Sequence, residues 1–471
     1  MKRNALYAVL LGVCLLCAKY AETQEFSGIR MDNFSGSNGM LFNPASPVSG
    51  SIPWDVNVLA AGISEDNNYI SIPRPFITYL HTSDSILDVD YFHPEKVYAH
   101  EQVLLQLPSA FFTFNDFAAG FFTTARSAGY FLGDQVDGGT TGLKDIPFYA
   151  PTVMPAFNAG TMLWTEIGFN LEATLERNSV YAFHVGANVK YLTGFEALGF
   201  ENIDPFLFTK DTVNTSISAF NTHFDYTRNL GSNRLYDPSN YSINGHGIGM
   251  DLGAVFTIHR PSKFKYSKNQ DYYWKFGASL LDLGVLKFKN NAGSYHLEQD
   301  ESFSVANIVL DSIDDIDEFN RTGSRILYDF SDASQDGNRF SMYLPAALAL
   351  TADRWITGDL YAQAVIVRRI PHVGTNLIAR ANMFALIPRY ETRMYGFSLP
   401  LTLYEDREFK FGASARWMFF TIGSDNLLTF IDQHDYSSID LYCSIRITPY
   451  WLVPKVERRG IDCFRWKKNK Q

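Results

Sequence analysis

Charged and ionisable residues occur at alternate positions in several segments of the sequence, and these are the residues that could do chemistry. They are Glu166, Glu172, His184, Lys190, Asp251 and Lys275. Carboxylates, a histidine and lysines could together form an acid/base site. The chain holds no Gly-x-Ser-x-Gly, His-Glu-x-x-His or phosphate-loop motif to support one. An enclosed polar interior also needs paired charges to satisfy its own groups, so we expect interior wall contacts and no catalytic residue.

The segments that carry these residues alternate strictly between apolar and polar side chains. Residues 163–175 and 181–191 form two such runs around a short turn at 176–179. Runs of about 12 residues exceed the mean strand of about 5–6 residues in globular proteins. A membrane-spanning β-strand needs about 9–11 residues, apolar toward lipid and polar toward a lumen, with aromatic residues at the interfaces. The pattern therefore predicts a hairpin of a transmembrane barrel.

Three further runs, at 247–259, 272–281 and 408–417, repeat the pattern. In the second, the alternation breaks near Leu281-Asp282, as at a β-bulge. We expect the polar face to point into the lumen; its residues are Glu166, Asn170, Glu172, His184, Asn188, Lys190, Asp251, Lys275 and Arg416. We expect the aromatic face to meet lipid; its residues are Phe169, Tyr181, Phe183, Tyr191, Phe256, Trp274, Phe409, Phe411 and Trp417.

Weaker alternating runs bring the predicted total to about 14 antiparallel strands of an all-β barrel. These runs lie near 54–62, 68–79, 101–113, 117–131, 340–352, 358–369, 376–387, 392–404 and 438–448. The short turns at 176–179 and 405–408 should both be periplasmic, yet this count puts them at opposite ends, so we expect one miscounted strand between 340 and 400. Three long connections remain, at 132–160, 193–246 and 290–339, of which we place the second and third outside the cell.

Composition supports a barrel and excludes some partners. Aromatic residues make up 15% of the 471 residues and charged residues only 19%, below the ~25% of soluble domains. The net charge of -10 argues against nucleic acid as a partner. We predict no metal and no cofactor. The acidic run 311–318 lacks the glycine-centred spacing of a calcium loop, and a solvated loop is the preferred interpretation.

The ends of the chain predict export and a lumen-associated leader. Lys2 and Arg3 followed by an apolar run indicate a signal peptide over 1–24, cut between Ala18 and Glu25. Residues 25–52, rich in turn-forming residues, form either a flexible leader or a plug in which Asn43-Pro44 fixes a turn. The barrel follows at 53–451 and a basic periplasmic tail at 452–471. Cys443 and Cys463 either form a disulfide or remain two thiols.

Five short motifs carry a family resemblance. They are, in order, Gly36-Ser-Asn-Gly-Met-Leu-Phe-Asn-Pro-Ala, Trp54-Asp-Val-Asn, Gly249-Met-Asp-Leu-Gly-Ala, Ser279-Leu-Leu-Asp-Leu-Gly and Ile422-Gly-Ser-Asp-Asn-Leu-Leu. Together they resemble an uncharacterised family of Bacteroidota outer-membrane barrels, similar to long-chain fatty-acid-transporter-like barrels. The resemblance implies about 14 strands with the N-terminal segment in or near the lumen, and it favours the plug.

Two functions remain as hypotheses for a protein of a Gram-negative outer membrane, surrounded by its lipid. The first is uptake or binding of a small hydrophobic ligand through the plugged lumen, with selectivity set by the lumen residues. The second is a non-transporting scaffold whose long loops hold a surface protein or a component of a type IX secretion apparatus, a partner that the resemblance suggests. An enzyme is not expected.

Overall fold

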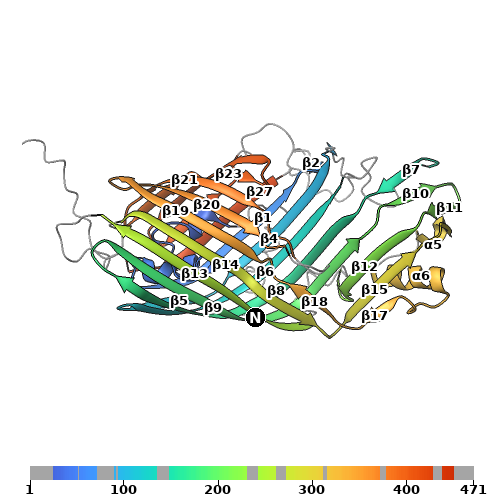
Figure 1. Ribbon diagram of the computed structural model, residues 1–471, viewed down its shortest axis with the longest axis horizontal. Helices are drawn as coiled ribbons and strands as arrows, with labels where there is room; N and C mark the ends of the chain where they lie inside the picture. Colours follow the sequence, from blue (N-terminus) through green and yellow to red (C-terminus); the bar gives the residue numbers. More distant parts are fainter. Residues whose placement is uncertain are drawn as a thin grey trace, which may run out of the picture.

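The chain folds into a closed antiparallel β-barrel of fourteen strands, as the sequence predicts. The computed structural model describes residues 25–50, 52–71, 90–91, 94–134, 148–230, 242–260, 272–310, 316–371, 378–427 and 438–449. Figure 1 shows the strands wrapped around the blue N-terminal segment, with an extension of strands and helices at the right-hand end. The barrel closes where the first strand pairs with the last, from Val56 opposite Ile447 to Asp66 opposite Ser438.

Ten barrel strands are single elements. They are β1 (Trp54–Asn67), β6 (Phe117–Asp134), β8 (Phe157–Arg177), β9 (Tyr181–Asn202), β13 (Gly245–His259), β14 (Tyr272–Phe288), β20 (Leu360–Arg369), β21 (Met383–Glu391), β26 (Phe420–Ser424) and β27 (Ser438–Ile447). The other four consist of two pieces each. They are β4 (Lys96–Gln106) with β5 (Ser109–Phe114), β18 (Phe340–Tyr343) with β19 (Ala347–Thr357), β22 (Tyr395–Ser398) with β23 (Leu401–Tyr404), and β24 (Glu408–Phe411) with β25 (Ala413–Trp417).

The interruptions within these four strands have local causes. Three of them contain a proline: Pro108, Pro345 and Pro400. Proline has no backbone N–H to donate to a strand ladder, so pairing breaks there. The fourth interruption is at Gly412, where a Cβ would lie 2.5 Å from the Asp425 Cα. Close approach of the chain at residue 425 therefore requires glycine at this point of the wall.

The set of barrel strands differs from the predicted set in two places, although the number agrees. Within the predicted strand 68–79, the described residues form only the two-residue strand β2 (Ile70–Ser71), which pairs with β3 (Asp90–Tyr91) outside the barrel. The short strand β26 was not predicted from the sequence. The turn at 405–408 follows the eleventh strand and lies at the opposite end of the barrel from the turn at 176–179, so the prediction that both turns are periplasmic was wrong. Between 340 and 404 the described residues form four barrel strands, the number predicted there, so the expected miscount was wrong.

The long connections are structured where they are described. β9 continues to Asn202, past the predicted end of its run, and pairs there with β12 (Phe220–Thr227). β15 (Ala292–Gln299) and β17 (Gln335–Gly337) extend this sheet. A second sheet holds β7 (Pro151–Met154), β10 (Phe206–Lys210), β11 (Asn214–Ile217) and β16 (Phe303–Ala306). Two helices follow, α5 (Asn307–Leu310) and α6 (Ile316–Tyr328). We call these elements the extension.

Helix α6 packs against the extension through an apolar face. Its Phe319 and Leu327 contact a buried cluster that includes Phe224 and Tyr295. Asp317, in its first turn, accepts a hydrogen bond of 2.7 Å from the Tyr226 hydroxyl. This carboxylate of the acidic run 311–318 is thus committed to a structural contact; residues 311–315 lie outside the described residues.

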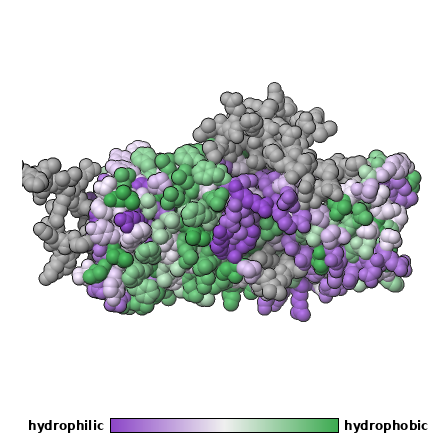
Figure 2. Space-filling model, turned by 45° about the horizontal axis from the view of Figure 1, so that its top comes forward, coloured by the Kyte–Doolittle hydropathy of each residue, from purple (hydrophilic) through white to green (hydrophobic). Residues whose placement is uncertain are grey.

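The outer surface of the barrel is apolar. On β8 the outward side chains of Ile167, Phe169 and Leu171 are 53%, 63% and 68% exposed, while the alternate side chains are buried inside. In Figure 2, green apolar residues gather over the left-hand part of the visible face and purple polar residues prevail at the right-hand end. Such a surface suits contact with lipid at one level of the molecule and with water beyond it. Among the described helices, none has the length and apolar character that crossing a membrane requires.

The segment from Glu25 to Gly50 lies inside the barrel. It contains three short helical turns, α2 (Ser27–Arg30), η1 (Gly36–Leu41) and α3 (Ser46–Ser49). All but four of its residues are buried. Met31 and Phe42 pack on aliphatic side chains that β19, β20 and β21 point inward. We call residues 25–50 the plug segment.

Candidate functional site

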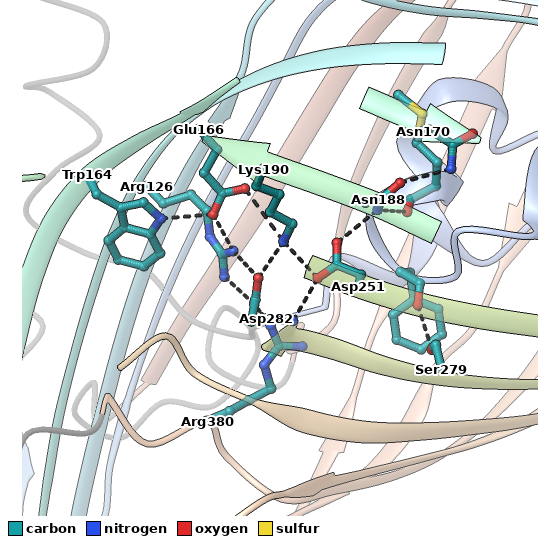
Figure 3. A network of polar contacts seen from close by, with 12 residues as sticks. Arg126, Trp164, Glu166, Asn170, Asn188, Lys190, Asp251, Ser279, Asp282 and Arg380 are labelled. Atoms are coloured by element: carbon teal, nitrogen blue, oxygen red, sulfur yellow. Dashed lines mark hydrogen bonds and ion pairs between the residues drawn. The ribbon is translucent and has the colours of Figure 1, made fainter. Parts of the chain in front are cut away.

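The lumen holds a connected layer of buried charges, drawn in Figure 3. Arg126 of β6 forms a two-point contact with Asp282 of β14, with N–O distances of 2.9 and 3.0 Å. Its Nη1 also lies 3.0 Å from Glu166 Oε1. Lys190 Nζ lies 2.7 Å from Asp282 Oδ1 and 2.8 Å from Asp251 Oδ1. Side chains from five strands are therefore bound into one layer across the lumen.

The plug segment belongs to the same layer. Arg380, just before β21, contacts Asp282 through Nη2 at 2.5 Å and the plug residue Glu25 through Nη1 at 2.9 Å. Arg30 lies 3.6 Å from the other oxygen of Glu25. The layer contains four cations, Arg30, Arg126, Lys190 and Arg380, and four carboxylates, Glu25, Glu166, Asp251 and Asp282. Buried charges are tolerated when they are paired and hydrogen-bonded, and the equal numbers meet that condition.

Asp282 occupies the centre of the layer because of a β-bulge. The register between β13 and β14 shifts between Met250 and Leu252, and Asp282 has a φ of 54°. Its backbone N–H donates to Asp251 Oδ1 at 2.7 Å. The broken alternation in the sequence indicated this bulge. It did not indicate that Asp282 would meet three cations.

The plug segment is hydrogen-bonded to side chains that the sequence predicted to face the lumen. Asn170 donates to the Pro44 carbonyl at 3.0 Å and Asn188 donates to the Met40 carbonyl at 2.9 Å. Glu172 accepts from the Val48 N–H at 2.7 Å. Lys190 and Glu166 make a wall contact of the expected kind, with 3.7 Å between Lys190 Nζ and Glu166 Oε2. Glu172, in contrast, bonds to the plug segment.

Two wall glycines make room for Asn43 and Pro44. A Cβ on Gly253 would meet the Asn43 amide oxygen and would lie 2.7 Å from Pro44 Cδ. A Cβ on Gly186 would meet the Pro44 carbonyl. Asn43 also receives the Ala45 N–H at 3.0 Å, which fixes the turn. The plug segment thus lies directly against the barrel backbone here.

A second polar group ties the plug segment to the end of the barrel that carries the short turns. Asn33 donates to Glu391 at 2.8 Å and accepts from Lys275 at 2.7 Å. Asp32 pairs with Arg416 at 2.9 Å. The Nδ1 atom of His184, at the same end, lies 3.0 Å from the hydroxyl oxygen of Thr174, another wall residue. Lys275 and Arg416 therefore hold the plug segment, and His184 belongs to the wall.

Two further aspartates anchor backbone N–H groups of the plug segment. Asp55 accepts from the Ser37 N–H at 2.8 Å, and Asp425 accepts from the Ser27 N–H at 2.9 Å. Asp55, Asp251, Asp282 and Asp425 are the acidic residues of four of the five sequence motifs. The motifs thus contribute to closing the lumen around the plug segment.

Beyond the charged layer, toward the long connections, the lumen lining becomes apolar. The buried side chains there include Met162, Trp164, Leu192, Leu286, Phe288, Met342 and Leu344. We call this set the apolar layer. Trp164 joins the two layers, because its Nε1–H donates to Glu166 Oε1 at 2.8 Å and its ring lies 4.9 Å from the Arg126 guanidinium carbon.

The aromatic residues expected on the lipid face lie on the outer surface. Phe169, Phe409 and Trp417 are 63–64% exposed and Tyr191 is 50% exposed. Phe256 is 36% exposed, and Tyr181, Phe183, Trp274 and Phe411 are half-buried among their neighbours. Each alternates along its strand with a side chain that points inward. Cys443 is half-buried on β27, and its pairing with Cys463 lies outside the described residues, as do the signal peptide and the basic tail.

Sequence reasoning missed several residues of the site. Arg126 lies in a run recognised as a strand, where a lone arginine on the polar face was the available signal. Arg380 and Glu391 gave no such signal, since their roles depend on which distant segments meet. Within the described part of the chain, no three His, Cys, Asp or Glu side chains gather in a way that could hold a metal ion.

Comparisons with known proteins give a family and a set of barrel structures. Residues 45–425 match the family described as "Family of unknown function (DUF5723)", and the chain belongs to this family. No curated protein sequence matches the chain. Among solved structures, the toluene transporter TbuX of Ralstonia pickettii shows 7% identity and a TM-score of 0.32, over 91% of this chain and 99% of that one. A FadL homologue of Pseudomonas aeruginosa shows 9% identity and a TM-score of 0.26, over 90% and 97%.

Proposed function

We propose that the protein is an outer-membrane barrel that binds or passes a small hydrophobic ligand through a lumen closed by residues 25–50. The observation that carries this proposal is the apolar layer on the long-connection side of the charged layer. A water-filled channel needs a polar lining, whereas Met162, Leu286 and Met342 point into this lumen. A lining of this kind suits an apolar molecule, whose affinity would come from burial.

The charged layer would act as the barrier beneath the apolar layer. An apolar ligand cannot cross it while Arg380 joins Glu25 of the plug segment to Asp282 of the wall. Passage would require the plug segment to move, and separating buried partners has a high free-energy cost. The proposal thus predicts a barrel that is closed at rest. Export by a signal peptide and an origin in the Bacteroidota are parts of the same proposal.

Naphthalene binding tests this proposal. We expect the purified barrel to bind more naphthalene in equilibrium dialysis than protein-free micelles of the same detergent do. Met342→Glu, which places a charge in the apolar layer, should remove this excess. Ser341→Glu, on the opposite face of the same strand, is the matched control and should keep it. Equal uptake by micelles and native barrel would contradict ligand binding.

A second candidate function, a scaffold for a partner protein, is favoured by the exposed apolar residues of the extension. Tyr149, Leu207 and Val213 are 67%, 48% and 63% exposed beyond the barrel. Exposed apolar patches of this kind often mark protein interfaces. A photo-crosslinking residue at Leu207 should then give one defined protein adduct in intact cells, whereas the same residue at the lipid-facing Leu171 should not. Absence of an adduct at Leu207 would count against the scaffold.

A further inference from the structure

The outer surface of the barrel carries an apolar groove across β13, β14, β19 and β20. Its volume is about 470 Å³, within the range of ~300–1,000 Å³ typical of ligand pockets. The floor is formed by small residues on paired strands, because Ala254 lies opposite Ala278 and Ala352 opposite Ala364. Larger side chains, among them Phe256, Phe276, Leu350 and Ile366, form its walls.

A cation stands beside this groove on the short-turn side. Arg354 is the next outward residue after Ala352 on β19, and it lies opposite Trp274 of β14. Its guanidinium carbon lies 4.7 Å from the Trp274 ring centroid, and that ring stacks on Phe276 at 5.5 Å. Arg354 is exposed, and no carboxylate of the described residues lies within ion-pair distance of it. Its charge is therefore available to an external anion.

We propose that this groove binds one acyl chain of an anionic phospholipid, whose phosphate group contacts Arg354. The short turns mark the periplasmic end in barrels of this kind, so Arg354 and Trp274 would stand at the level of lipid headgroups. An arginine at a membrane surface attracts anionic headgroups, and a neighbouring apolar groove adds burial of the chain. The inference rests on the barrel being in a membrane and does not depend on a ligand in the lumen.

The four alanines matter because of their size. Elsewhere on the outer face, residues such as Phe169 and Leu171 project into the surroundings. At the groove an acyl chain can lie against the sheet itself, with side chains on both flanks. The acyl chain would therefore gain protein contacts on three sides, whereas an acyl chain of the ordinary surrounding lipid does not.

Native mass spectrometry of the purified full-length barrel tests the proposal. Phosphatidylglycerol and phosphatidylcholine with identical chains are added separately. We expect one phosphatidylglycerol to remain bound under conditions that remove other lipids, and to bind at least tenfold more tightly than phosphatidylcholine. Ala364→Phe should abolish its retention, whereas Ala119→Phe, on the outer face of β6, should not. Arg354→Gln should abolish the preference between the two lipids, whereas Arg368→Gln, at the other end of the outer face, should keep it.

Heat-modifiable electrophoretic mobility shows that each variant is folded. Equal lipid retention by the native barrel and Ala364→Phe would overturn the proposal. A dimer that Ala364→Phe dissociates would also overturn it, because the groove would then hold a second copy of the chain. Met342→Glu, which tests the lumen, should leave phosphatidylglycerol retention unchanged, so failure of ligand binding and failure of lipid binding are distinguishable.

Discussion

The Nη1 atom of Arg380 lies 2.9 Å from the Oε1 atom of Glu25, a contact between residues 355 positions apart in the chain. Arg380 precedes a barrel strand, and Glu25 begins the described part of the plug segment. The same guanidinium contacts Asp282 of the wall. The segment in the lumen and the wall around it are therefore joined by one buried network, and changes to the network should alter both stability and closure.

Loss of the central carboxylate should destabilise the barrel. Asp282→Asn leaves Arg126, Lys190 and Arg380 without their shared partner, and breaking a buried ion pair typically costs about 3–5 kcal/mol. Urea-induced unfolding in detergent measures this cost. Asp406→Asn is the control, since its pair with Arg368 is half-exposed and should contribute about 0–1 kcal/mol. Similar losses for both variants would refute a central role for Asp282.

Enlarging a wall glycine should displace the plug segment. In Gly253→Ala the new methyl group would meet Asn43 and Pro44, so we expect brief openings in single-channel recordings that the native barrel lacks. Gly129→Ala is the control, because its Cβ would lie 3.5 Å from the nearest atom, an ordinary contact. A Gly253→Ala barrel as silent as the control would show that the plug segment accommodates the methyl group.

The free-energy cost of a charge on the outward face should depend on its depth in the membrane. Phe169 lies at the middle of the outward run from Leu163 to Leu175, so Phe169→Arg should cost about 2–4 kcal/mol in a lipid bilayer. Phe117 begins β6 beside a short turn, and Phe117→Arg should cost about 0–1 kcal/mol. Reversible unfolding from vesicles compares the two. Equal costs would mean that Phe169 does not lie at the centre of the membrane.

The extension should respond to pH through His223. Burial lowers the pKa of this histidine, but the hydrogen bond and charge of Asp225, with Asp336 and Glu201, outweigh it, and the net pKa is raised above 6.5. A raised pKa in the folded state adds stability below the unfolded pKa, and this stability is lost as the pH rises through the folded pKa.

Hydrogen exchange should therefore be slower in β12 and β15 at pH 5.5 than at pH 8, after correction for the intrinsic rates. His223→Gln should remove most of this difference. Retention of the full difference in the variant would assign the pH response to another group.

The sequence predicts the wall of this barrel better than its contents. Alternation is a local property, so the inward placement of Asn170 and Asn188 could be read from neighbouring residues. The partners of Asp282 come from β6, β9 and the segment before β21, and no local pattern brings them together. The short strand β26 was missed because five residues are too few to show a period, and in the predicted strand 68–79 the described residues Ile70 and Ser71 pair outside the barrel.

Closure of the lumen by residues 25–50 is the central claim, and single-channel conductance in planar bilayers tests it most directly. The refolded mature chain should be silent, and a variant that lacks residues 25–50, shown to be folded by its heat-modifiable mobility, should conduct. Steady conductance by the complete mature chain, at the level of the shortened one, would contradict the account.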